Sequence, residues 1–116
     1  MIDRSKKITG RFYALGSGRR PVRDWLLELS RDDRRIIGRD IQKVEFGWPL
    51  GMPLVRKLEA GLWEVRINVA AGIVRVLFTI LGVELILLHA FVKKSPAMPK
   101  DELTLARRRM KEVQRG

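Results

Sequence analysis

Apolar and polar residues follow the clearest pattern between Lys57 and Lys94. Three runs rich in Val, Ile, Leu and Phe lie there, separated only by the sequences Ala-Ala-Gly and Leu-Gly. β-Branched and aromatic residues favour strands, and short glycine-containing breaks between such runs favour tight turns. The pattern therefore predicts a three-stranded antiparallel meander, preceded by a short strand from Leu54 to Leu58.

The spacing of apolar residues predicts three helices around this meander. Pro21 suits the first position of a helix, Ser30 suits the N-cap of a second helix that ends near Gly47, and Pro99 opens a third. Ile8 to Leu15 is predicted to add a short edge strand. The predicted fold class is α+β: an N-terminal helical hairpin packed on a twisted antiparallel sheet of about four strands, plus a C-terminal helix. The apolar stripes of the helices, at helical spacing, are Val22, Trp25, Leu26 and Leu29; Ile37, Ile41 and Val44; and Leu103, Ala106, Met110 and Val113.

The turns of the meander decide which residues share a face. A two-residue turn at Ala71 and Gly72 predicts the apolar pairs Val69 with Val74, Ile67 with Val76, and Val65 with Phe78. On the other face it places Arg66 opposite Leu77 and Asn68 opposite Arg75, so that Arg66 and Arg75 lie diagonally. A turn at Leu81 and Gly82 places His89 beside Val74 on the apolar face, whereas a turn longer by one residue moves His89 to the cationic face.

Composition indicates a single domain over residues 1–116, because 46% apolar and 32% charged residues are typical of a globular chain. The longest apolar run, Ile80 to Val92, contains Glu84 and His89 and is too short to span a bilayer. Met1 to Arg4 precede further charged residues, so no signal peptide is expected. The chain has no cysteine, which excludes disulfides and thiolate metal sites. A cytoplasmic protein without a cofactor is expected.

The net charge of +11 is large for 116 residues and indicates a polyanionic partner, with nucleic acid favoured over a membrane. Basic residues are spread from Arg4 to Arg115 and include positions in the strands. A membrane-binding protein more often concentrates them in one amphipathic helix or tail. A surface whose charge only increases solubility is the alternative.

The side chains available for catalysis are mainly arginines and lysines. One histidine, no cysteine and no serine in a G-x-S-x-G motif exclude the common metal and nucleophile sites. Metal-free RNA cleavage is compatible with this set, because fixed Arg and Lys groups stabilise the extra negative charge of the phosphorane transition state. Arg66 and Arg75 are candidates for this role, and salt bridges to Glu64 and Glu84 are the structural alternative.

Proton transfer has its own candidates. Lys93 and Lys94 are placed among other cations, and neighbouring cations lower the pKa of a lysine. The alternative for both is a solvated strand end. His89 is either a catalytic imidazole or a hydrogen-bonded core histidine. Arg107, Arg108 and Arg109 indicate a solvated helix end that can also contact RNA phosphate.

Four blocks occur in one order between Trp25 and Val113. They are Lys57-Leu58-x-x-Gly61-Leu62-Trp63-Glu64-Val65-Arg66, Arg75-Val76-Leu77-Phe78, Leu87-Leu88-His89-x-Phe91-x-Lys93-Lys94, and Pro99-x-x-Glu102-Leu103-x-x-Ala106. This set resembles the phage-derived, HigB-type branch of the RelE toxin superfamily. The resemblance implies a RelE-like α+β fold.

The resemblance also implies the toxin of a type II toxin–antitoxin pair. Many such toxins are metal-independent, ribosome-dependent mRNA endoribonucleases, held inactive by an antitoxin that is often a helix-turn-helix protein. By position, Arg66 and Arg75 are implied to bind or stabilise the scissile phosphate, and Lys57, Lys93 and Lys94 to bind RNA or move protons. His89 matches its block without an assigned role. A non-catalytic nucleic-acid-binding or regulatory protein with the same fold is the alternative.

Overall fold

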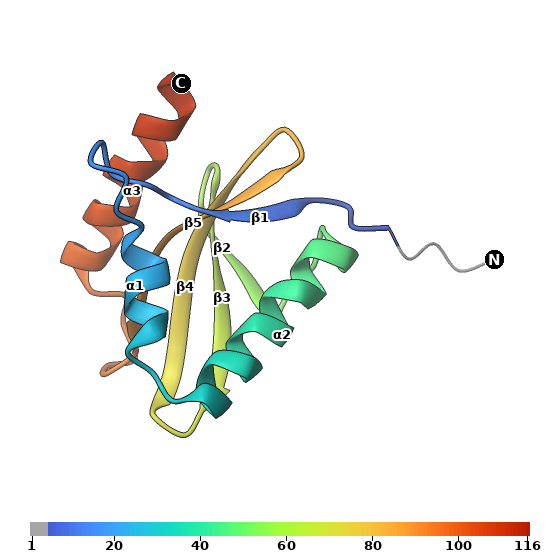
Figure 1. Cartoon of the computed structure of the whole chain (residues 1–116), viewed down its shortest axis with the longest axis vertical. Coiled ribbons are helices and arrows are strands. Elements are labelled where there is room, and N and C mark those ends of the chain that lie inside the picture. The colour runs from blue at the N-terminus through green and yellow to red at the C-terminus, as the bar shows by residue number, and fades with distance from the viewer. Residues whose placement is uncertain (1–4) are drawn as a thin grey trace.

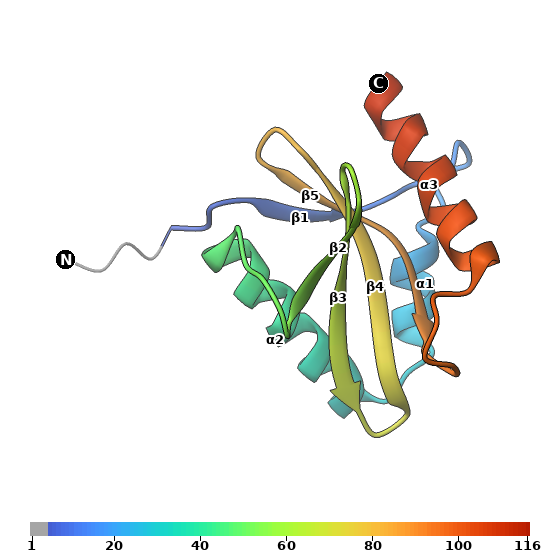
Figure 2. The same ribbon diagram turned by 180° about the vertical axis from the view of Figure 1, so that it is seen from behind.

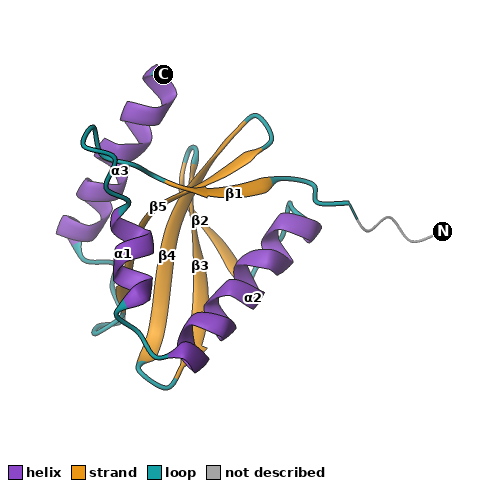
Figure 3. Cartoon of the chain, viewed as in Figure 1, coloured by secondary structure: helices purple, strands orange, loops and turns teal. Residues whose placement is uncertain are grey.

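The computed structural model describes residues 5–116 (Figures 1 and 3). The expectation drawn from Met1 to Arg4, that no signal peptide is present, concerns residues outside this range. Among the described residues, no helix has the length and apolar character needed to cross a membrane. The elements in chain order are β1 (Thr9–Phe12), α1 (Pro21–Leu27), α2 (Arg31–Gly47), β2 (Val55–Glu59), β3 (Leu62–Val69), β4 (Gly72–Leu81), β5 (Glu84–Val92) and α3 (Lys100–Arg115).

The strands form one five-stranded sheet in the order β1-β5-β4-β3-β2. β2 to β5 are antiparallel neighbours, which confirms the predicted meander. β1 lies at the edge as expected, but it runs parallel to β5, with Thr9 opposite Glu84 and Phe12 opposite Leu87. The sheet therefore contains each of the predicted strands, but it is mixed, whereas an antiparallel sheet was expected. A parallel pair needs a long connection, and here the intervening chain includes α1, α2 and the first strands of the meander.

Helices cover both faces of the sheet (Figures 1 and 2). On one face α1 packs against β5 and α2 against β3, and on the other face α3 packs against β4 and β5. The predicted apolar stripes face the sheet, with Val22, Ile37 and Val44 buried on the first face and Ala106 and Met110 on the second. α3 covers only part of its face, and Figure 2 shows β2, β3 and the adjoining end of β4 without a helix over them.

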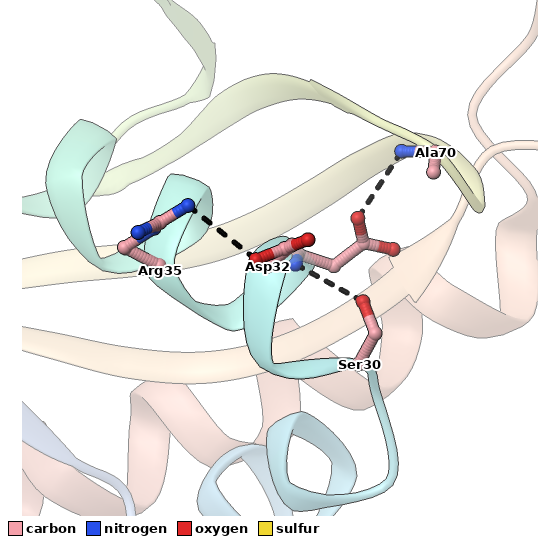
Figure 4. A network of polar contacts seen from close by, with 5 residues as sticks. Ser30, Asp32, Arg35 and Ala70 are labelled. Atoms are coloured by element: carbon pink, nitrogen blue, oxygen red, sulfur yellow. Dashed lines mark hydrogen bonds and ion pairs between the residues drawn. The ribbon is translucent and has the colours of Figure 1, made fainter.

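The turn between β3 and β4 differs from the predicted turn, because Ala70 and Ala71 form it in place of Ala71 and Gly72. The cause lies in α2. The Asp33 carboxylate accepts hydrogen bonds from the backbone N–H groups of Ala70, at 3.2 Å, and Ala71, at 3.3 Å. The N–H of Asp33 donates in turn to Ser30 Oγ, at 3.1 Å, at the start of the helix (Figure 4). The first turn of α2 thus fixes the hairpin.

The observed turn has the same length as the predicted one but lies one residue earlier in the chain, which moves the register of β3 and β4 by two residues. Such a shift keeps every side chain on its predicted face. It changes the partners, however: Arg66 lies directly opposite Arg75, so the predicted pairing of Arg66 with Leu77 was wrong. Gly72 becomes a strand residue with φ of +133°, and a Cβ there would lie 3.1 Å from Val92 Cγ1. Close packing on β5 therefore accounts for this glycine.

Replacing Asp33 by alanine is expected to lower the free energy of unfolding by about 1–2 kcal/mol, because two hydrogen bonds to a charged group are lost at a turn that water can still reach. Urea denaturation measures the loss. Asp32→Ala is the matched control, since Asp32 makes only an exposed ion pair with Arg35, at 3.4 Å (Figure 4). Its expected effect is within about 0.5 kcal/mol. Equal losses in the two variants would show that Asp33 does not hold the hairpin.

A β-bulge changes the position of His89. Phe78 lies opposite Leu87, whereas Leu77 lies opposite His89, so Leu88 is an extra residue in β5. One inserted residue reverses the alternation of faces in the rest of the strand. His89 therefore lies on the face covered by α3, which is the second of the two positions that the sequence left open, and not beside Val74. The bulge places it there, because the turn between β4 and β5 keeps two residues, Gly82 and Val83 in place of Leu81 and Gly82.

Candidate functional site

Arg66 on β3 and Arg75 on β4 lie directly opposite each other, on the face of the sheet that α3 partly covers. Like charges directly opposite in an antiparallel pair destabilise it, so the stability of the sheet does not favour this arrangement. The Nε atom of each arginine is shielded from solvent and has no hydrogen-bond acceptor. Two adjacent guanidinium groups with unused donors give this place a positive potential, and whichever of them reaches the surface is suited to bind an oxyanion such as phosphate.

Glu64 places a carboxylate beside these arginines. Its side chain is fully buried, and its Oε2 lies 3.5 Å from Nε of Arg75. Neither oxygen of Glu64 has a partner in hydrogen-bonding geometry, so the contact is an ion pair without a hydrogen bond. A buried charge is costly unless an opposite charge lies next to it. Glu64 and Arg75 therefore depend on each other.

Arg75 and Arg66 differ in their access to solvent. Arg75 is 1% exposed, and its Nη1 lies 4.0 Å from the sulfur of Met98, in the segment between β5 and α3. Arg66 is partly exposed and lines a pocket of about 420 Å³. Arg66 can therefore contact a ligand directly, whereas Arg75 is buried beside Met98 and has no direct access to solvent.

Lys93 follows β5, and its backbone N–H donates to a carbonyl oxygen of β4 at 2.6 Å. Partial burial lowers the pKa of the Lys93 ammonium group, and the charges of Arg75 and Arg66 lower it further. Glu64 opposes this shift, and Arg56 adds to it. A lysine with a lowered pKa exchanges its proton more readily at neutral pH.

Arg56 on β2 is a site residue that the sequence pattern did not indicate. It lies opposite Glu64 and is exposed on the same face. Lys57, the RNA-binding candidate, lies opposite Trp63, so the alternation of β2 turns it to the face that α1 and α2 cover. Pairing β2 with β3 in the sequence would have identified Arg56. The term cationic cluster is used below for Arg56, Arg66, Arg75 and Lys93 around Glu64.

His89 and Lys94 have other surroundings. His89 Nε2 lies 2.8 Å from Glu102 Oε2 on α3, and its ring stacks on Phe91 with centroids 5.6 Å apart. This is a hydrogen-bonded histidine between β5 and α3. Lys94 is exposed and lines a separate pocket together with Trp25 of α1. The structure therefore brings Lys93, and neither of these residues, into the cationic cluster.

The three consecutive arginines of α3 differ in their contacts. Arg107 donates two hydrogen bonds to the Glu59 carboxylate, at 2.8 and 3.0 Å, and this contact raises the pKa of Arg107. Arg109 donates to a backbone carbonyl of β5 at 2.8 Å and lies 5.1 Å from the centre of the Tyr13 ring, and burial lowers its pKa. Arg108 is exposed. Arg107 and Arg109 thus hold α3 to the sheet.

Within residues 5–116, no group of three or more His, Cys, Asp or Glu side chains is placed to hold a metal ion. Glu64 forms an ion pair with Arg75 and acts electrostatically on Lys93, so its neighbours include two cations.

Comparison with known proteins gives a family match over most of the chain. The model of the family described as phage derived protein Gp49-like (DUF891) matches residues 24–111. A search of curated proteins gives no match. The matched range extends from α1 into α3 and contains every residue of the cationic cluster.

Proposed function

The chain belongs to the family of phage-derived Gp49-like proteins, which is related to the RelE and HigB toxins, and on this premise we propose that it is the toxin of a type II toxin–antitoxin pair. We propose that it cleaves mRNA on the ribosome without a metal ion, as HigB-type toxins do. Its partner is a cognate antitoxin, commonly a helix-turn-helix protein. The direct pairing of Arg66 with Arg75 beside buried Glu64 is the observation that carries the proposal.

The cleavage step uses the RNA 2′-hydroxyl as nucleophile. Its oxygen forms a bond to the adjacent phosphorus while the bond from phosphorus to the 5′-oxygen breaks, giving a 2′,3′-cyclic phosphate and a 5′-hydroxyl. Arg66 binds the non-bridging oxygens, whose negative charge increases in the transition state. Arg75 adds positive potential from below, in a buried setting where charge is poorly screened.

Lys93 is the proposed proton-transfer group. Its lowered pKa increases the fraction of neutral amine, which accepts the proton of the 2′-hydroxyl. The resulting ammonium group can return a proton to the departing 5′-oxygen. Arg108, exposed on α3, is proposed to contact an RNA phosphate outside the cluster.

The burial of Arg75 favours a second candidate function, RNA binding without cleavage. An arginine that Met98 covers cannot touch a phosphate in this arrangement. The cluster would then hold RNA through Arg56, Arg66 and Lys93 alone. Such a protein would bind ribosomes or mRNA and leave the phosphodiester bonds intact.

Two measurements test the proposal. Expression of the protein is expected to arrest growth, and co-expression of the product of the neighbouring gene is expected to restore it. Purified protein added to translating ribosomes is expected to cut mRNA at defined codons, as primer extension detects. Ribosome binding with intact mRNA, at all protein concentrations tested, would support the second candidate and contradict the first.

The pH dependence of cleavage is expected to shift in opposite directions in two variants. Arg56→Gln removes a cation that lowers the pKa of Lys93, so the rising limb of kcat/KM against pH moves to higher pH. Glu64→Gln removes the opposing anion, so the limb moves to lower pH. Arg115→Gln, at the end of α3, is the control and leaves the profile unchanged. Shifts in the same direction for Arg56 and Glu64 would argue against Lys93 as the titrating group.

A further inference from the structure

A second pocket, here called the edge pocket, is lined by residues of α1, β5 and α3 and of the segment that joins β5 to α3. Figures 1 and 2 show how these three elements are arranged. Its volume is about 490 Å³, which is within the range of small-ligand sites. Its walls combine two aromatic rings, one cation and two carboxylates. They include Trp25, Phe91, Val92, Lys94, Asp101 and Glu102.

Two residues that line the edge pocket are direct neighbours of residues in the cationic cluster. Phe91 on its wall lies directly opposite Arg75 across β4 and β5. Lys94 of the pocket is the residue after Lys93 of the cluster. A chain of nucleotides bound at the cluster therefore needs to advance only past the end of β5 to reach the pocket.

We propose that the edge pocket binds one unstacked base of the RNA, with a preference for guanine; this rests on the proposed function. Single-stranded RNA is commonly recognised by bases stacked on aromatic side chains and hydrogen-bonded along their Watson–Crick edges. Trp25 and Phe91 supply the aromatic surface, and Lys94 supplies a cation for the adjoining phosphate.

The carboxylates explain the preference for guanine. A carboxylate only accepts hydrogen bonds, so it matches a base edge with adjacent donors. Guanine presents N1–H and N2–H side by side, whereas adenine and cytosine place an acceptor beside their amino group and uracil has a single N–H. Asp101 is exposed in the first turn of α3. Glu102 uses Oε2 for His89, which leaves Oε1 for a ligand.

An extended peptide added to the edge of β5 fits less well. Such a strand needs a row of free backbone groups along the edge. Arg109 already donates to the Leu88 carbonyl at 2.8 Å, and Ala90 is 5% exposed beneath α1. The part of β5 that precedes Val92 is therefore not free to pair with an added strand, and the remaining space suits a compact ligand.

The test uses four 2′-O-methyl trinucleotides, UGU, UAU, UCU and UUU, which lack the nucleophilic hydroxyl and cannot be cut. Binding to the full-length protein is followed by the indole N–H signal of Trp25 in ¹H–¹⁵N spectra, identified with Trp25→Phe. The rings of Trp48 and Trp63 contact each other, with centroids 5.1 Å apart, on the other side of the sheet from α3. Their indole N–H signals provide internal references. UGU is expected to bind about tenfold more tightly than UUU.

Two variants separate base recognition from phosphate binding. Asp101→Asn is expected to reduce the preference for UGU several-fold, whereas Asp32→Asn, the same change in the first turn of α2, leaves it intact. Lys94→Gln is expected to weaken the binding of all four trinucleotides by a similar factor. It is also expected to reduce the slope of log Kd against log salt concentration by about one, the amount that corresponds to one phosphate contact.

Equal affinity for the four trinucleotides, or a preference that survives Asp101→Asn, would overturn the inference. So would a Trp25 signal that moves only when a protein partner is added, because the pocket would then be a docking site. The outcome is independent of cleavage. Guanine binding by a protein that does not cut mRNA would refute the proposed nuclease activity and support the base-binding pocket. Codon cleavage that Asp101→Asn leaves unchanged would support the nuclease activity and refute the base-binding pocket.

Discussion

Replacing Arg66 by methionine is expected to slow mRNA cleavage by about 10²- to 10³-fold, because the group that contacts the developing phosphorane charge is removed. The long apolar stem is retained, and the side chain is only partly buried, so the sheet is expected to keep its fold. The measurement is the single-turnover cleavage rate on programmed ribosomes. Thermal unfolding of the same preparation verifies that the fold is unchanged.

The control for Arg66 is Arg39→Met on α2, which removes one exposed positive charge that does not belong to the cationic cluster. It is expected to leave the cleavage rate within about twofold, since an exposed charge is largely screened at physiological salt. Equal loss in the two variants would mean that net charge, rather than the position of Arg66, governs the reaction.

Replacing Arg75 by methionine is expected to lower the free energy of unfolding by about 3 kcal/mol and to abolish cleavage, because it leaves the buried Glu64 carboxylate without its ion-pair partner. Urea denaturation gives the loss of stability. The effect on stability distinguishes Arg75 from Arg66, whose replacement affects the reaction alone.

A double variant separates the two effects of Arg75. Replacing Glu64 by leucine together with Arg75→Met removes both buried charges, and stability is expected to return to within about 1 kcal/mol of the original protein. Cleavage is expected to remain absent, since the positive potential beneath the phosphate is still missing. Losses that simply add in the double variant would show that the two side chains are not coupled. Cleavage that returned together with stability would assign Arg75 a purely structural role.

The local patterns of the sequence predicted most elements of the fold correctly. Ser30 caps α2, Pro21 begins α1, and the apolar stripe of α3 faces the sheet, because capping and side-chain periodicity depend on residues near one another in the chain. The parallel pairing of β1 depends on a partner more than seventy residues away. No local pattern contains that information.

The candidate site was predicted in part. Arg66 and Arg75 were identified, and they lie on one face as expected. Arg56 was missed in favour of its neighbour Lys57, because the register of β2 against β3 decides which of two adjacent basic residues faces the cluster. His89 changed faces through a bulge, which the periodicity of β5 does not show.

By itself, the sequence determined most elements, the two faces of β3 and β4 and the presence of cations among the strands. The tertiary structure decided how those cations meet. Asp33 of α2 binds the amides of Ala70 and Ala71, and the resulting turn sets Arg66 directly against Arg75. The physical reason is that the alternation of side chains fixes a face within one strand, whereas the partner across the sheet depends on contacts between distant segments.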